Sequence, residues 1–169
     1  MTNVKTLTTL SMMLAAAIVL NVIEMQLNII PVPGAKIGFA NLVTVIVLYL
    51  FDFKKASLVT ILRVLLVGLL YRSFTVTFWM GLSGAIFSII TMGIMKKWFR
   101  LHIVTVSVFG AIFHNIGQII AGIYLLEEGL LVYYLPFMLF ISVPAGFLIG
   151  VISNRFLQVY SRNFKVSSF

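Results

Sequence analysis

The chain has 169 residues, of which 62% are hydrophobic and only 9% are charged, and its mean hydropathy is +1.15. A soluble domain is about half apolar and a quarter charged, and a domain of this size has too little interior to bury so much apolar surface. We therefore expect one integral membrane domain over residues 1–169. The absence of cysteine excludes disulfides and thiolate chemistry, and two histidines with four carboxylates predict neither a metal site nor a cofactor.

The formal net charge of +8 does not indicate a nucleic-acid partner, because the basic residues stand at the ends of apolar runs rather than in one patch. The opening run MTNVKTLTTLSMMLAAAIVL has the outline of a signal peptide, with one lysine followed by an apolar stretch. Five further apolar segments follow it. We therefore interpret the run as the first membrane span.

The apolar runs predict an all-α membrane protein, folded as a compact bundle of six transmembrane helices. The six segments are residues 7–23, 38–51, 56–70, 75–95, 103–126 and 130–153. The second and third are short for a span, and an alternative in which one of them re-enters the membrane or merges with its neighbour would change the count. All connections between these segments are short except residues 24–37, so we expect no second domain.

The lysines and arginines predict the orientation of the bundle. In the six-span arrangement two of them, Lys36 and Arg72, fall on one side of the membrane. Nine fall on the other side: Lys5, Lys54, Lys55, Lys96, Lys97, Arg100, Arg155, Arg162 and Lys165. By the positive-inside rule both termini are cytoplasmic in a bacterial cytoplasmic membrane. The basic segment RFLQVYSRNFKVSSF is then expected at the anionic cytoplasmic surface.

Several polar side chains stand within the apolar segments. Arg63 is near the middle of the third, where an unpaired arginine costs a few kcal/mol or more, so it is expected to face the bundle interior or a wet cavity. His114 and Gln118 are four residues apart on one helical face, and Asn21 and Glu24 share a face of the first segment. With alternate helices running outward, the polar set lies between the midplane and the outer surface. Its members are Asn21, Glu24, Lys36, Asn41, Arg63, Arg72, His114, Asn115 and Gln118.

Two interpretations of this polar set stay open. Taken singly, Arg63 binds helix carbonyls, His114 and Gln118 hydrogen-bond two helices together, and Lys36 is a loop lysine. Taken together, the residues predict an outward-facing pocket for a small solute with an anionic group. The stretch PVPGAKIGFAN, residues 31–41, would then be a lid or wall, with prolines that stiffen it and glycines that permit tight backbone geometry.

Small residues in the first segment form a second pattern. Ser11 and Ala15 stand four apart, which allows close approach of another helix. The same spacing recurs in Gly81 with Ala85, Gly84 with Ser88, and Gly146 with Gly150. We expect these later pairs to serve packing inside the bundle.

The runs PVPGAKIGFANLVTVIVLYLF, LRVLL, AIFHNIGQII and YYLP resemble the Gx transporter family, also labelled heptaprenyl diphosphate synthase component I, and the resemblance covers nearly the whole chain. That family is similar to the substrate-binding S components of energy-coupling factor transporters. The resemblance implies an outward pocket covered by the loop between helices one and two. It also implies that small residues of helix one contact a coupling transmembrane subunit driven by two cytoplasmic ATPases. Ser11 and Ala15 fit that contact, with serine where alanine is typical.

Three functions are compatible with these observations. The first is a non-enzymatic substrate-binding subunit that captures a vitamin or precursor for uptake driven by separate ATPases, because the chain has no GxxxxGK[ST] phosphate loop. The second is an accessory role in heptaprenyl diphosphate or quinone biosynthesis; the single aspartate, Asp52, cannot supply the clustered carboxylates of a catalytic subunit. The third is a quinone-binding electron-transfer partner of an extracytoplasmic flavoprotein, with His114 and Gln118 hydrogen-bonded to quinone carbonyls.

Overall fold

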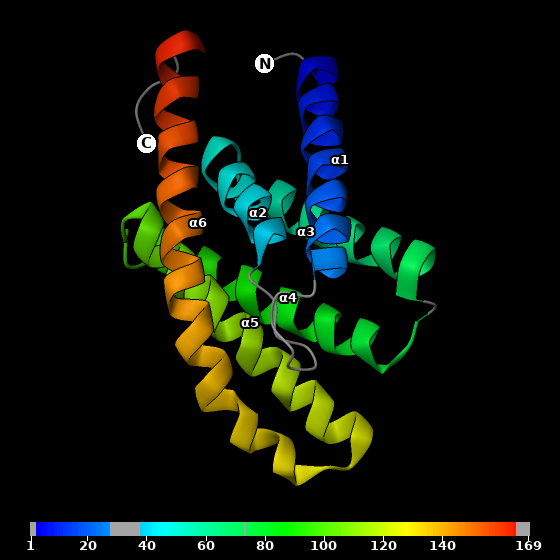
Figure 1. Cartoon of the computed structure of the whole chain (residues 1–169). Helices are drawn as coiled ribbons and strands as arrows, with labels where there is room; N and C mark the ends of the chain where they lie inside the picture. Colours follow the sequence, from blue (N-terminus) through cyan, green and yellow to red (C-terminus); the bar gives the residue numbers. More distant parts are fainter. Residues whose placement is uncertain (1–2, 28–37, 73, 165–169) are drawn as a thin grey trace.

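The structure is a computed structural model that describes residues 3–27, 38–72 and 74–164. This part of the chain forms six α-helices and two short helical segments, without a strand (Figure 1). In chain order they are α1 (Asn3–Leu27), α2 (Phe39–Leu50), α3 (Phe53–Val67), the π-helical turn η1 (Gly68–Arg72), α4 (Val76–Lys97), α5 (Ile103–Leu126), the 3-10 segment η2 (Gly129–Tyr134) and α6 (Leu135–Phe164). The predicted all-α architecture is confirmed, and each predicted segment overlaps one of these α-helices.

Four helical stretches are long and apolar enough to cross a membrane, which agrees with a multi-pass membrane protein. They are Val4–Gln26, Val76–Lys97, Ile103–Leu126 and Gly129–Arg162. At 1.5 Å per residue, the 12 residues of α2 extend about 18 Å, whereas the hydrocarbon layer is about 30 Å thick. The count of six crossings and their direction stay predictions.

The shortness of α2 is explained by its central position. It contacts all five of the other α-helices, and every residue over 43–49 is buried. A helix that is covered around its whole circumference has no solvent-exposed polar face, which accounts for a sequence that is apolar except at Asn41 and Thr44. Because its neighbours shield it from lipid, it need not match the thickness of the membrane.

Glycines bring α4, α5 and α6 into close contact. A Cβ atom on Gly117 would lie 3.0 Å from Cα of Gly84, so α5 and α4 touch through their backbones. Ser83 reinforces this crossing by donating to the Gly117 carbonyl at 2.9 Å. On the other side of α5, a Cβ atom on Gly150 of α6 would lie 2.6 Å from Cα of Val104. Small residues permit such close approaches. Through them α5 packs against α4 on one side and α6 on the other.

Helix α1 is the least covered of the long helices. It contacts α2 and α3 but none of the other α-helices. Only 11% of its apolar span is buried, against 50% for the spans of α4 and α5. Ala17 faces the bundle and is buried, whereas Ser11 and Ala15 lie on the exposed face. The small-residue pair singled out in the sequence is therefore accessible from outside the bundle.

Different parts of the chain form the two ends of the molecule. The first turn of α1 and the last turn of α6 lie at one end of the molecule, and the connection between α5 and α6 lies at the opposite end (Figure 1). Helix α3 begins at Phe53, earlier than the predicted span, because the Asp52 side chain accepts a hydrogen bond from the Lys55 backbone N–H at 2.8 Å and caps the helix. Helix α6 runs past Pro144 and continues to Phe164, well beyond the apolar segment.

Candidate functional site

A polar cavity lies among α1, α2, α3, α4 and α5. It is lined by Asn21, Glu24, Gly38, Asn41, Arg63, Val64, Val67, Phe78, Gly81 and His114. The structure thus brings together five of the nine polar residues singled out in the sequence, and they come from four different helices. Such convergence of separate elements is what a binding site requires.

The polar groups of this cavity are deeply buried. The exposed fraction is 3% for Arg63, 8% for Asn21 and 9% for Glu24. Burying a charge in an apolar bundle is costly unless hydrogen bonds or an opposite charge compensate it. The cavity is lined by one acidic residue from α1, Glu24, and one basic residue from α3, Arg63, whose formal charges are opposite.

Glu24 links α1 to the start of α2. Its carboxylate accepts a hydrogen bond from the backbone N–H of Gly38, the residue that precedes α2. Gly38 has a φ of 88°, in the left-handed region that strongly favours glycine. The carboxylate sits at the positive end of the α2 dipole, which stabilises its charge. The Asn41 N–H donates to the Gly38 carbonyl at 2.7 Å and holds the turn that brings Asn41 to the cavity.

Arg63 is held in position by the packing of α3 against α2. One turn before it, the hydroxyl of Thr60 is hydrogen-bonded to that of Thr44 on α2, with 3.0 Å between the oxygens. Both threonines are buried. Since residues three and four apart share a helical face, Thr60, Arg63 and Val67 all point into the bundle. Arg63 thus lines the cavity from a helix that packs against α2.

His114 reaches the cavity through the close crossing of α4 and α5. A Cβ atom on Gly84 would lie 2.7 Å from the His114 carbonyl oxygen and 2.7 Å from Cγ of Gln118. Gln118 is 1% exposed and does not line the cavity. In the described part of the chain its Oε1 atom has no hydrogen-bond partner. The predicted face with both residues exists, but only His114 reaches the cavity.

One other predicted site residue, Asn115, does not line the cavity, and the structure does not describe the side chains of two more. Asn115 donates from Nδ2 to the Met138 carbonyl at 3.2 Å and so connects α5 to α6. Its side chain departs about 100° around the helix from that of His114, because successive helical residues are rotated by that angle. Lys36 lies outside the described residues, and so does the side chain of Arg72.

Some residues of the cavity carried no chemical signal in the sequence. Val67 stands four residues after Arg63, so helical spacing alone would have placed it beside the arginine. Phe78 and Gly81 come from the first turns of α4, where neither residue type indicates a binding site. Gly81 was noted as part of a small-residue pair. Their position depends on how α4 packs against α3, which the sequence does not determine locally.

The cavity is small. Its volume is about 30 Å³, enough for about two water molecules, since one water needs roughly 10–15 Å³ by the same measure. An organic solute therefore requires part of the wall to move. Helix α1 supplies Asn21 and Glu24 and is the least covered wall element, so its displacement would disturb the fewest contacts.

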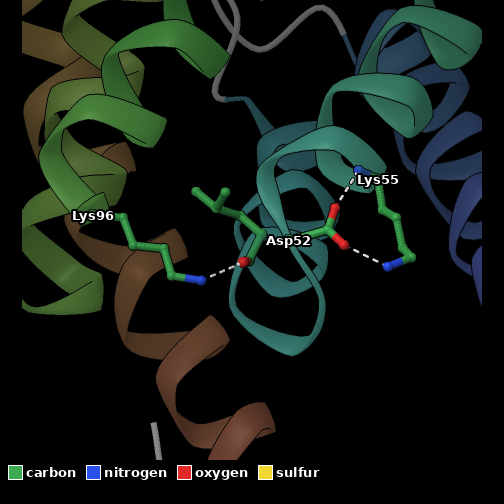
Figure 2. A network of polar contacts seen from close by, with 4 residues as sticks. Asp52, Lys55 and Lys96 are labelled. Carbon is green, nitrogen blue, oxygen red and sulfur yellow. Dashed lines mark hydrogen bonds and ion pairs between the residues drawn. The ribbon is translucent and has the colours of Figure 1, made fainter. Parts of the chain in front are cut away.

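A separate group of charges lies at the far end of α2. Lys96 of α4 donates from Nζ to the Leu48 carbonyl at 2.6 Å (Figure 2) and lies 4.7 Å from the centre of the Tyr49 ring. Asp52 accepts hydrogen bonds from both the backbone and the side chain of Lys55 (Figure 2). The side-chain hydrogen bond from Lys55 is the main cause that lowers the pKa of Asp52 below its ordinary value. These residues anchor helix ends and lie apart from the cavity.

Comparison with known proteins gives one informative match. A family model described as heptaprenyl diphosphate synthase component I matches residues 13–156. This range includes most of α1, all of α2 to α5 and most of α6, and with them every described residue of the cavity. No curated protein and no solved structure matched the chain.

Proposed function

The chain belongs to the heptaprenyl diphosphate synthase component I family, and we propose that it is a substrate-binding membrane subunit. In this proposal it captures a small solute with an anionic group, a vitamin or a biosynthetic precursor, from the outer side of a bacterial cytoplasmic membrane. Separate subunits then drive uptake with ATP. The observation that carries the proposal is the burial of Arg63 in a polar cavity lined from five helices.

The chemistry of the cavity supports binding of a solute rather than packing alone. An arginine inside a membrane bundle is costly to keep, and such residues mark substrate or ion pathways by default. Here a guanidinium, a carboxylate, an imidazole and two amides share one hollow. The other end of α2, by contrast, lies in a core of apolar side chains. The polar side chains that line the cavity therefore gather near the start of α2 and not along its whole length.

The exposed face of α1 supports the proposed partner. Ser11 and Ala15 are both exposed there, so a second transmembrane helix can approach the α1 backbone closely. The same helix supplies Asn21 and Glu24 to the cavity. A coupling subunit that binds α1 would therefore be in mechanical contact with the binding site, which suits a transporter whose energy comes from ATPases on other chains.

An uptake experiment tests this proposal. Cells that express the protein with its coupling subunits should accumulate a labelled vitamin or quinone precursor in an ATP-dependent manner. Ala15→Trp should abolish uptake and leave solute binding by the purified protein unchanged, because the bulky ring blocks the partner helix far from the cavity. Leu148→Trp, on an exposed position of α6, is the matched control. Loss of binding in Ala15→Trp, or full uptake by this variant, would contradict the proposed coupling.

The family description favours a second candidate function, an accessory role in heptaprenyl diphosphate synthesis. Prenyl transfer from a diphosphate normally uses magnesium held by several carboxylates. The sequence has four carboxylates in all, and they are dispersed over Glu24, Asp52, Glu127 and Glu128. The role would then be to present a lipid substrate rather than to catalyse transfer. Long-chain prenyl diphosphate formed by the synthase with and without this chain distinguishes the two functions.

A further inference from the structure

We propose that Glu24 determines the specificity of the cavity and selects an amphoteric solute. Such a solute carries an anionic group for Arg63 and, on the same small molecule, a cationic or N–H group for Glu24. This inference rests on the proposed function and adds to it a second required group on the ligand. It defines the class of solute from the hydrogen-bond acceptors on the α1 side of the cavity and the donors on the α3 side.

The wall formed by α1 offers acceptors. An ionised carboxylate can only accept hydrogen bonds, and one oxygen of Glu24 already accepts from the Gly38 N–H. Asn21 stands one turn before Glu24 on the same face and is 8% exposed. Its Oδ1 atom has no hydrogen-bond partner among the residues that the structure describes. A buried amide oxygen left in this state is costly, and a ligand donor would remove the cost.

The wall formed by α3 offers donors. A guanidinium has five N–H donors and no acceptor, and it binds carboxylate or phosphate groups well. Arg63 and Glu24 line the same cavity and are both at least nine-tenths buried. A solute with only an anionic group would be attracted by Arg63 but repelled by the carboxylate of Glu24. A solute with only a cationic group would be attracted by Glu24 but repelled by Arg63.

Matched sets of small solutes test this inference on the full chain in detergent. The first set is β-alanine, propionate and propylamine; the second is 4-aminobenzoate, benzoate and aniline. Within at least one set, the amphoteric member should raise the thermal midpoint of the wild-type protein at lower concentration than the other two. Glu24→Gln keeps an acceptor for Gly38 and should preserve the fold. It should reduce the preference for the amphoteric member over the anion by about tenfold or more.

Each outcome separates this inference from the function on which it rests. Glu128→Gln, at an exposed acidic residue, is the control and should keep the wild-type preference. If the anion binds as well as the amphoteric member, or if Glu24→Gln leaves their ratio unchanged, the inference is overturned while solute capture stands. Stabilisation by no member of either set also overturns it, because the acceptors of α1 would then hold water alone. The proposed function fails separately, if Arg63 substitutions leave the binding of every anionic solute unaltered.

Discussion

Lys96 and Leu48 join α4 to the end of α2: the ammonium group of Lys96 donates to the Leu48 carbonyl at 2.6 Å. This carbonyl belongs to the last turn of α2, where helix carbonyls lack partners within the helix and carry the negative end of the dipole. The same ammonium group lies over the Tyr49 ring, and the Tyr49 hydroxyl donates to the Leu101 carbonyl at 3.2 Å. One end of the central helix is thereby fixed to α4 and to the segment that follows it.

Replacing Lys96 should loosen this end of α2. Lys96→Met keeps much of the apolar stem but removes the charged donor and the cation–π contact, so the free energy of unfolding should fall by about 1–3 kcal/mol. Lys97→Met is the matched control, because Lys97 is exposed and makes no hydrogen bond or ion pair described for this region. Thermal unfolding in detergent measures both. Equal effects of the two substitutions would show that net charge, rather than the contact with α2, sets the stability.

The crossing of α4 and α5 should tolerate no added side-chain atom at Gly84. In Gly84→Ala the new Cβ would lie 2.7 Å from the His114 carbonyl oxygen, so the helices must separate, at a cost of about 1–3 kcal/mol. Because His114 would move with α5, solute binding should weaken as well. Gly129→Ala is the control, since no heavy atom lies within 4 Å of its added Cβ. A Gly84→Ala variant as stable as Gly129→Ala would contradict the described crossing.

Asn115 should contribute to stability and not to binding. Asn115→Ala removes the hydrogen bond to the Met138 carbonyl and should lower the free energy of unfolding by about 1 kcal/mol, in line with hydrogen bonds between helices in membrane proteins. The affinity for any solute that stabilises the wild type should stay within about twofold, an energy change well below that of a lost hydrogen bond. Thermal unfolding with and without solute measures both quantities. A large loss of affinity at unchanged stability would contradict this prediction and show that Asn115 contributes to solute binding.

The hydrogen bonds of Asp52 predict a pH effect of definite sign. Folding lowers the pKa of this carboxyl through Lys55. Its contribution to stability is therefore present above the unfolded-state pKa and is lost as the pH falls through the lower folded-state pKa. The stability difference between wild type and Asp52→Asn should be small, because the pair is exposed and screened by salt. It should shrink further between about pH 5 and pH 2. A difference that grows on acidification would contradict this assignment.

Much of the fold follows from the sequence because length and apolar content determine where membrane helices form. The gathering of Asn21, Glu24, Asn41 and Arg63 was also predictable, since alternate helices run in opposite directions and set these residues at one depth. Depth alone does not determine the direction of a side chain. Asn115 therefore faces α6 although it adjoins His114 in the sequence. The central burial of α2 and the small volume of the cavity depend on contacts among helices distant in the sequence.

The most direct test of the account is solute-dependent stabilisation of Arg63 variants. Wild-type protein and the exposed control Arg155→Gln should both be stabilised against heat by at least one anionic vitamin or precursor. Arg63→Gln should lose this stabilisation, and Arg63→Lys, which keeps the charge but not the planar fork, should retain part of it. If Arg63→Gln folds and is stabilised by the same solutes to the same extent as the wild type, the cavity around Arg63 is not the binding site.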